Sequence, residues 1–264
     1  MPTLETVRGL LAKLQRSHIR PRFDVLPELE PIPWHALPPG VDPLWGGLLH
    51  RRLERKRRQA EYLLNVARKF VRPGAHLVDF GAGTGHIGLA LAALFPDCHV
   101  SLVEVKPVSL RIARERIQTA GLQNVSIYDC RAEHLHEHFD LGLALHVCGD
   151  GTDEALDACL HQRAAYVMCP CDLGALRDSS RPYPRSDALR AIMPREDYNR
   201  LAKVADWTSW QFSEEKSRLA LQASAWLALD RNLLAQQHGY RTLLLHVNPL
   251  EAGLKSLILA GQPT

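Results

Sequence analysis

Short apolar runs alternate with amphipathic segments through the middle of the chain. The apolar runs have the length and composition of buried strands, at 75–80, 99–104, 124–129, 140–146 and 164–169. The intervening segments repeat apolar residues at helical spacing, at 86–95, 107–120 and 151–162. This alternation predicts an α/β fold with a mostly parallel, doubly wound sheet.

The two ends of the chain depart from this alternation. Leucines at helical spacing predict a helix within 3–17, and seven prolines exclude regular structure from 21–43. A long helix is expected over 48–71. We therefore separate residues 1–47, a helix and a proline-rich wrapping segment with Trp34 and Trp45 as anchors, from a domain over 48–264.

After Asp172 the pattern changes again. A loop with three prolines at 176–194 precedes two helical patterns, 195–206 and 214–237. The last two apolar runs, 240–247 and 255–260, are separated by turn residues and predict a C-terminal antiparallel hairpin.

A glycine-rich turn follows the first predicted strand. Residues 76–88 read HLVDFGAGTGHIG, so that Asp79 precedes a loop containing Gly81, Ala82, Gly83 and Gly85. Glycines allow a ligand to approach the backbone. Glu104 ends the second apolar run, where an acid commonly accepts hydrogen bonds from the hydroxyls of a ribose. These features predict an adenosine cofactor.

Two other interpretations remain for this turn. Gly83, Gly85 and Gly88 match the dinucleotide pattern G-x-G-x-x-G, but that pattern should begin directly after the strand, at Gly81. From Gly81, His86 stands at the third glycine position, which favours a cofactor other than a dinucleotide. An α/β domain without a nucleotide is the remaining alternative.

The turn and its acid resemble those of class I S-adenosyl-L-methionine-dependent methyltransferases, which have a Rossmann-like sheet with a C-terminal antiparallel hairpin. The resemblance implies S-adenosyl-L-methionine as cofactor, bound by Asp79, the residues Gly81, Ala82, Gly83 and Gly85, and Glu104. Asp79 would orient the loop amides or the cofactor's amino group. It also implies adenine contacts near the end of the third strand. The candidates there are Asp129, Cys130 and Arg131.

Histidine and cysteine follow the fourth and fifth strands, whose carboxyl ends should be neighbours. The fourth leads into His146, Cys148, Asp150 and Asp153, and the fifth into Cys169 and Cys171. The spacing of these loops resembles the methyltransferase part of glutathione S-transferase C-terminal domain-containing proteins, from about Pro39 to the C-terminus. The transferase-like N-terminal domain of the longer members has no counterpart here. A more distant likeness is to acceptor-stem tRNA 2′-O-methyltransferases. Asp172 stands where related sequences often have another cysteine.

Four interpretations of these residues stay open. We favour a substrate pocket in which His146 and Cys148 line the methyl-transfer site, His146 also borders the cofactor, and Asp150 or Asp153 organises the loop. Alternatively, Cys169 or Cys171 is a nucleophile that adds to a pyrimidine, or the cluster binds zinc, although its spacings are tighter than those of usual zinc sites. The cysteines are otherwise small buried hydrophobic residues. Asp153 is also a candidate cap for the following helix. We expect no metal.

Charge adds a substrate hypothesis. Six basic residues fall within 51–58, and Arg55, Lys56 and Arg57 are candidate RNA contacts, with tRNA favoured. A solvated helical face, partly neutralised by Glu54 and Glu61, is the alternative. A protein or small-molecule substrate, or a non-catalytic module that binds cofactor or RNA, also remains open, and the sequence does not identify a protein partner.

Composition limits the setting. The chain has 264 residues, a net charge of +3 and six cysteines, which is atypical of a disulfide scaffold and indicates a reducing compartment. No apolar run is long enough to cross a membrane, and the N-terminus lacks the apolar core of a secretory signal. We therefore expect a cytoplasmic protein without membrane contact.

Overall fold

A computed structural model describes residues 3–46, 50–207, 213–247 and 256–264. Its centre is a seven-stranded sheet in the order β3-β2-β1-β4-β5-β7-β6. The strands are β1 (His76–Phe80), β2 (His99–Glu104), β3 (Val125–Asp129), β4 (Leu141–Cys148), β5 (Ala165–Cys171), β6 (Tyr240–His246) and β7 (Leu257–Pro263). Strands β1 to β5 are parallel, and β7 runs antiparallel to both β5 and β6. The predicted Rossmann-like sheet with a terminal antiparallel hairpin is confirmed.

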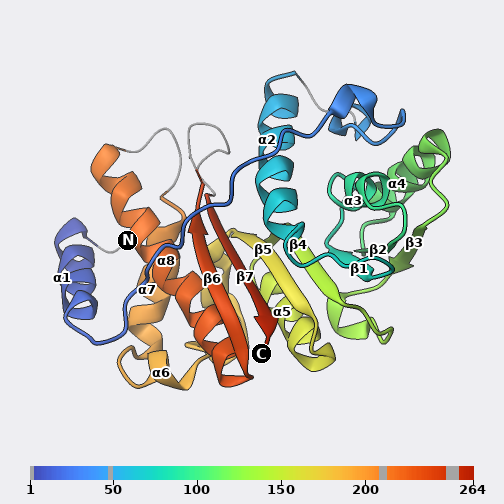
Figure 1. Ribbon diagram of the computed structural model, residues 1–264. Coiled ribbons are helices and arrows are strands. Elements are labelled where there is room, and N and C mark those ends of the chain that lie inside the picture. Colours follow the sequence, from blue (N-terminus) through green and yellow to red (C-terminus); the bar gives the residue numbers. More distant parts are fainter. Residues whose placement is uncertain (1–2, 47–49, 208–212, 248–255) are drawn as a thin grey trace.

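Helices cover both faces of this sheet, as Figure 1 shows. The α-helices are α1 (Leu4–Gln15), α2 (His50–Ala67), α3 (Gly88–Leu94), α4 (Pro107–Ala120), α5 (Gly151–Gln162), α6 (Asp187–Arg190), α7 (Arg195–Ala205) and α8 (Glu214–Gln237). Short 3₁₀ turns occur at η1 (Trp34–Ala36), η2 (Pro43–Gly46), η3 (Ala132–His134) and η4 (Leu173–Asp178). The predicted loop at 176–194 therefore contains the end of η4 and the one-turn helix α6.

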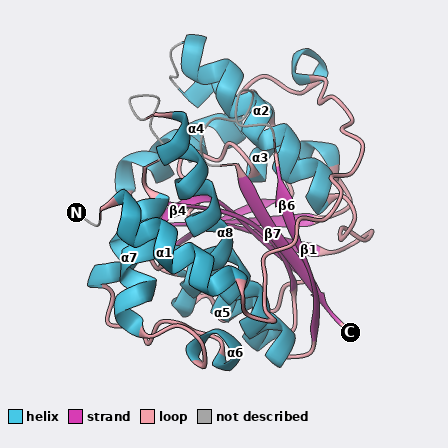
Figure 2. Cartoon of the chain, turned by 90° about the vertical axis from the view of Figure 1, so that its left-hand side faces the viewer, coloured by secondary structure: helices cyan, strands magenta, loops and turns pink. Residues whose placement is uncertain are grey.

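Alternation along the strands divides the core into two layers. Leu77 packs in a cluster with residues of α2, α3 and α4, whereas its neighbour Val78 packs with residues of α5 and α8. Side chains alternate between the faces of a strand, so one strand contributes to both clusters. A third cluster joins α1, α6 and α7 to α8, and these helices lie together in Figure 2.

The proline-rich segment runs along the surface from α1 to α2 (Figure 1) and is held by the backbone as well as by side chains. Asp24 extends the edge strand β6 through an N–H bond to the Leu244 carbonyl at 2.8 Å. Further along, the buried Arg116 of α4 donates to the carbonyl oxygens of Gly40 and Val41 at 2.8 and 2.9 Å. The segment thus covers a sheet edge that would otherwise present unpaired backbone groups.

One of the two tryptophans proposed as anchors has that role. Trp34 is buried and its indole N–H donates to Glu61 Oε1 of α2 at 3.0 Å. Trp45 is 53% exposed, so its predicted anchoring role is wrong. It belongs to a 3₁₀ turn that leaves the ring outside the core.

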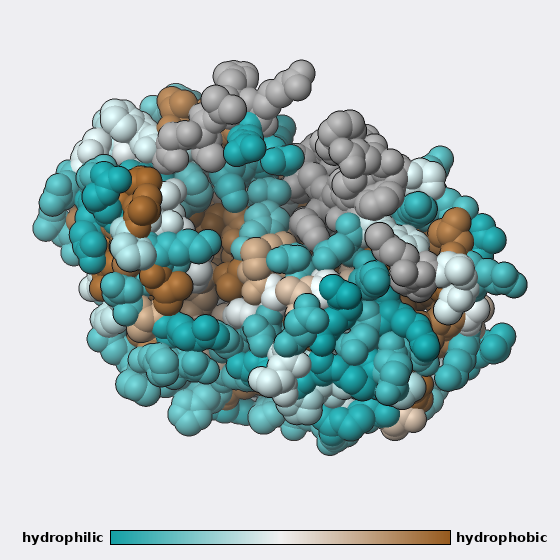
Figure 3. Space-filling model, turned by 180° about the vertical axis from the view of Figure 1, so that it is seen from behind, coloured by the Kyte–Doolittle hydropathy of each residue, from teal (hydrophilic) through white to brown (hydrophobic). Residues whose placement is uncertain are grey.

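Polar side chains cover most of the surface seen in Figure 3, and apolar side chains gather in a hollow on that face. Among the helices of the described ranges, none has both the length and the hydrophobicity required to cross a bilayer.

A buried ion pair connects α5 to α8. Asp153 and Arg231 are both fully buried, and the guanidinium donates to the two carboxylate oxygens at 3.1 and 2.6 Å. Arg185 and the Tyr183 hydroxyl also donate to this carboxylate, at 3.1 and 2.8 Å. Although burial raises the pKa of Asp153, the opposing attraction of Arg231 and Arg185 leaves the pKa below its usual value.

We predict that Arg231→Leu lowers the free energy of unfolding by about 3–5 kcal/mol, because it leaves a charged carboxylate without its main buried partner. Urea denaturation measures the change. Tyr183→Phe is the matched control, since it removes one hydrogen bond and should cost only about 1 kcal/mol. A loss below about 1 kcal/mol for Arg231→Leu would contradict this role of the ion pair.

Candidate functional site

A cavity of about 300 Å³ opens at the carboxyl ends of β1, β2 and β4. This is the point where the chain leaves the sheet in opposite directions from neighbouring strands, and ligands of open parallel sheets bind at that point. The volume is at the lower end of the range found for small-molecule sites. The cavity therefore lies where the sequence predicted the cofactor.

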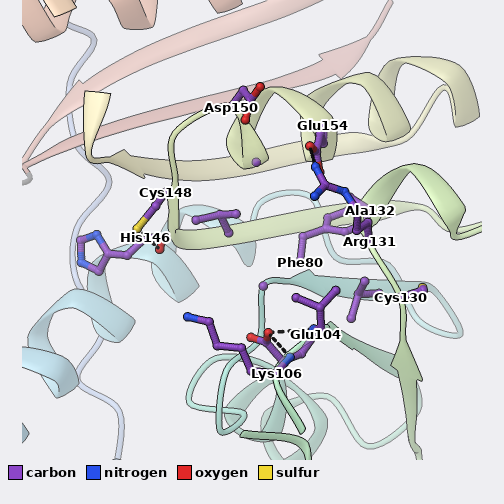
Figure 4. Close-up of a pocket in the computed structure, with 15 residues that line it drawn as sticks. Phe80, Glu104, Lys106, Cys130, Arg131, Ala132, His146, Cys148, Asp150 and Glu154 are labelled. Atoms are coloured by element: carbon purple, nitrogen blue, oxygen red, sulfur yellow. Dashed lines mark hydrogen bonds and ion pairs between the residues drawn. The ribbon is translucent and has the colours of Figure 1, made fainter. Parts of the chain in front are cut away.

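Its wall contains seven of the predicted site residues, namely Gly81, Glu104, Cys130, Arg131, His146, Cys148 and Asp150. Figure 4 shows Glu104 and Lys106 on one side of the pocket, with Asp150 and Glu154 on the opposite side. His146 and Cys148 form a third side. The pocket brings together residues from four separate loops.

The Glu104 carboxylate holds the glycine-rich loop against the end of β2. Its Oε2 accepts the N–H of Gly83 at 2.8 Å, and its Oε1 accepts the N–H groups of Val105 and Lys106 at 2.8 and 2.9 Å. Lys106 therefore meets Glu104 through its backbone. An ionised carboxylate has about four acceptor positions, so these bonds leave capacity for a ribose hydroxyl.

Positive φ angles shape the loop itself. Gly81, Gly83 and Gly85 have φ values of 61°, 57° and 84°, which residues other than glycine rarely adopt. A Cβ atom at Gly81 would lie 2.6 Å from Val147 Cγ2, so this glycine also lets the loop approach the segment after β4. Ala82 is buried, and its N–H bonds to the Val103 carbonyl at 3.1 Å.

Asp79 is buried at the end of β1, behind the glycine-rich loop, and does not line the cavity. Its Oδ2 accepts the N–H of Gly88, in the first turn of α3, at 2.8 Å. Of the two roles expected for Asp79, the one with a direct contact here is the orientation of backbone amides. Burial raises the pKa of this carboxyl to about 7, and the attraction of Lys56 only partly opposes that effect.

His86 occupies the position where a dinucleotide loop would carry its third glycine. Arg116 donates to His86 Nδ1 at 3.2 Å, while His86 Nε2 lies 3.1 Å from the Thr84 hydroxyl. Burial, with Arg116 and Lys56 nearby, lowers the pKa of His86 to about 3. The imidazole is therefore neutral, and the close approach of helix to strand occurs at Gly88, where a Cβ atom would lie 2.0 Å from Leu102 Cδ2.

The residues after β3 have different placements. Cys130 and Arg131 line the cavity, whereas Asp129 is exposed at the strand end and is the register partner of Glu104. The Arg131 guanidinium forms an ion pair with Glu154 of α5 across the pocket wall. Adenine contacts by Cys130 or Arg131 therefore fit this geometry better than contacts by the Asp129 side chain.

The end of β4 and the start of α5 have an unusual local geometry. His146 has a φ of 61°, an uncommon conformation for a residue with a side chain, and such conformations cluster at functional sites. Asp150 Oδ2 accepts the Ser179 hydroxyl at 2.7 Å. The start of α5 has no side-chain cap, because the Asp153 carboxylate is engaged by Arg231, so the predicted capping by Asp153 is wrong.

The cysteines at the ends of β4 and β5 meet as predicted. Cys148 Sγ is 3.5 Å from Cys171 Sγ, and these two residues are register partners. Cys169 and Cys171 are buried and lie behind the wall that Cys148 forms. In the described part of the chain, no group of three or more His, Cys, Asp or Glu side chains is arranged to hold a metal ion.

The predicted RNA contacts on α2 have three orientations. Arg55 is exposed, but Arg57 forms ion pairs with Asp42 and Glu54. Lys56 is half-buried, and burial lowers its pKa against the opposing attraction of Cys169, Asp79 and Cys171. These influences indicate that its side chain is directed toward the carboxyl end of the sheet, where the cysteines lie.

Sequence reasoning missed several residues of the wall, and they are mostly apolar or backbone contributors. These residues are Phe80, Val103, Val105, Lys106, Ala132, Val147, Gly151 and Glu154. Val105 follows the expected ribose acid directly and is 49% exposed, so its side chain is available to contact a base.

Comparisons with known proteins agree with this geometry. Residues 72–172 match the family model described as a methyltransferase domain. The glutathione S-transferase C-terminal domain-containing protein of Mus musculus is 31% identical over 258 residues, which is 97% of this chain and 41% of the relative. Its Drosophila melanogaster homolog is 33% identical over 236 residues, covering 88% and 40%. The chain thus spans about two-fifths of the length of these curated relatives.

Among solved structures, the SAH-bound methyltransferase PaMTH1 of Podospora anserina has a similar fold. The TM-score is 0.53 at 16% identity, and the match covers 100% of this chain and 98% of that one. This similarity confirms the predicted Rossmann-like fold, and the family model assigns a methyltransferase domain to residues 72–172. The roles of the individual site residues stay predictions.

We predict that Glu104→Ala weakens the binding of S-adenosylhomocysteine by at least about tenfold, because hydrogen bonds to a charged group contribute about 1.5–3 kcal/mol. Isothermal titration calorimetry measures the affinity. Glu115→Ala removes an exposed carboxylate of α4 that does not line the pocket, and it is the matched control. Equal affinities for the two variants would contradict the ribose role of Glu104.

A second prediction concerns pH. The pKa of Asp79 is raised to about 7 in the folded protein, so the folded state holds a proton that the unfolded state releases near its ordinary pKa of 3.8. The stability contribution of this group is therefore present at low pH and is lost as the pH rises to about 7. Asp79→Asn should become more stable relative to wild type between pH 4 and pH 8.

Urea denaturation across this pH range tests that sign. The asparagine keeps an oxygen that accepts the Gly88 N–H, so the change isolates the ionisation. A difference between variant and wild type that stays constant with pH would show that Asp79 does not titrate in this window.

Proposed function

We propose that this chain is a class I methyltransferase that uses S-adenosyl-L-methionine and transfers its methyl group to RNA, with tRNA as the favoured RNA. The observation that carries the proposal is the position of α2. Its Arg52 and Arg55 are exposed, while Lys56 of the same helix is half-buried and lies within electrostatic range of Cys169 and Cys171. The basic surface therefore lies on a helix that packs against β4, the strand whose end borders the pocket.

The pattern of ion pairs on α2 supports a role for these two arginines in RNA binding. Within the described part of the chain, neither Arg52 nor Arg55 has an ion-pair partner, in contrast to Arg57 and Arg58. Unpaired exposed cations on one helix suit phosphate groups, which dominate the affinity of nucleic-acid complexes. A backbone held on this face would present a nucleotide to the neighbouring cavity.

The geometry of the pocket also suits a positioned hydroxyl or ring atom. Methyl transfer needs an in-line nucleophile close to the sulfonium carbon, and much of the rate comes from positioning. His146 and Cys148 form a side of the cavity separate from that of Glu104, the expected ribose acceptor. We assign the methyl-transfer end of the site to this side.

One relative, matched over a short segment, has a name that includes an RNA substrate. The ribosomal RNA small subunit methyltransferase G of Parabacteroides distasonis is 36% identical over 69 residues, which is 26% of this chain. This match lends the proposal limited support because it is short. The position of the α2 arginines remains the stronger argument.

The direct test uses radiolabelled S-adenosyl-L-methionine and extract from cells that lack the protein. Label incorporated by the purified chain should disappear on RNase treatment and survive protease treatment. Label that survives RNase and is removed by protease would contradict the RNA proposal and indicate a protein substrate.

We predict that the double variant Arg52→Glu/Arg55→Glu weakens tRNA binding and lowers the slope of log K against log salt by about 2, because each lost phosphate contact contributes about 0.9. Fluorescence anisotropy at several salt concentrations measures both values. Arg16→Glu/Arg218→Glu is the matched control, since both arginines are exposed. Arg16 directly follows α1, Arg218 lies on α8, and these helices are separate from α2 in Figure 1. The same salt slope for both double variants would exclude α2 as the RNA surface.

A further inference from the structure

The ends of β4 and β5 place two thiols in contact. Cys148 is exposed in the wall of the cavity, Cys171 is buried beside it, and their Sγ atoms are 3.5 Å apart. The residues are register partners on adjacent parallel strands, despite an irregularity in β4 between Leu145 and Cys148. We propose that Cys148 and Cys171 form a reversible disulfide when a peroxide reaches the pocket.

Strand geometry permits this bond. Neighbouring strands lie about 4.7–4.9 Å apart, which falls within the 4.4–6.8 Å between Cα atoms that a disulfide requires. The sulfur atoms must approach from 3.5 Å to about 2.05 Å, a movement available to the exposed Cys148 side chain. The irregularity in β4 lies directly before Cys148, where the strand departs from regular pairing and can adjust to the bond.

The surroundings favour a reaction at this pair over the other thiols. The Lys56 ammonium group and the thiolate forms of Cys171 and Cys169 attract one another. By contrast, burial raises the pKa of the Cys159 and Cys130 thiols, which suppresses the reactive thiolate there. Cys98 is buried and its thiol donates to the Arg72 carbonyl at 3.3 Å.

The chemistry balances with one peroxide molecule. The accessible Cys148 thiolate attacks a peroxide oxygen, the O–O bond breaks, and a sulfenic acid forms with release of water after proton uptake. The Cys171 thiolate then attacks the Cys148 sulfur, the S–S bond forms, and the leaving hydroxide takes a proton to give a second water. Two thiols are oxidised by two electrons, and hydrogen peroxide is reduced.

The bond would change the pocket, because Cys148 forms its wall next to His146. Oxidation draws the Cys148 side chain toward β5 and fixes the end of β4. We therefore expect the disulfide to inhibit methyl transfer, a consequence that rests on the proposed function, whereas bond formation itself does not.

The test is intact mass and peptide mapping of the full chain after treatment with hydrogen peroxide. Wild type should lose about 2 Da, two hydrogen atoms, and recover them with dithiothreitol. Cleavage after arginine gives one peptide with Cys148 and Cys159 and another with Cys169 and Cys171, so variants are needed to locate the bond. Cys148→Ser and Cys171→Ser should both lose the cross-link.

Cys169→Ser is the matched control, because it lies on the same strand and in the same peptide as Cys171. It should keep the cross-link. If Cys171→Ser fails to fold, Cys148→Ser gives the same information from the exposed partner. Loss of the cross-link in Cys169→Ser but not in Cys171→Ser would overturn the assignment, and so would wild type that keeps both thiols.

The inhibitory consequence has a separate readout. Cross-linked wild type should lose methyl transfer to RNA and regain it with dithiothreitol. Unchanged transfer by fully cross-linked protein would overturn the inhibitory role. Absence of transfer by the reduced protein would instead contradict the proposed substrate, while the mass result would stand.

Discussion

The Glu104 carboxylate is the interaction on which the candidate site depends. Three backbone N–H groups, from Gly83, Val105 and Lys106, converge on its two oxygens and join the glycine-rich loop to the end of β2. Hydrogen bonds to a charged group are stronger than those between neutral groups, so one side chain fixes the relation between two loops. The same carboxylate keeps acceptor positions for a ligand. On our prediction, one residue therefore serves both loop geometry and cofactor recognition.

The support behind Glu104 comes from buried polar groups that touch no substrate. Asp79 orients the first turn of α3, and Arg116 donates to the Thr84 carbonyl and to the proline-rich segment. On the other side of the sheet, Asp153 is held by Arg231 and fixes α5, whose first residues border the pocket. These rigid elements hold the loops of the site in place.

The periodicity of the sequence predicts most of this architecture. The helix at 107–120 has the predicted bounds, and the strand and hairpin order follows from buried runs and turn residues. Glu104 and the glycines were predictable because their chemistry is local to a strand–loop–helix unit. The buried ion pair of Asp153 was not predictable, since its partner Arg231 is 78 residues away and only the tertiary structure brings them together. Lys56 belongs to a basic run, yet its inward orientation depends on how α2 packs on the sheet.

The most direct measurement of the central claim is a crystal structure of the chain with S-adenosylhomocysteine bound. The account predicts the ribose hydroxyls at the Glu104 carboxylate, the base beside Val105 and Cys130, and the sulfur atom directed toward His146 and Cys148. A ligand bound at another edge of the sheet, or one whose ribose does not reach Glu104, would contradict it.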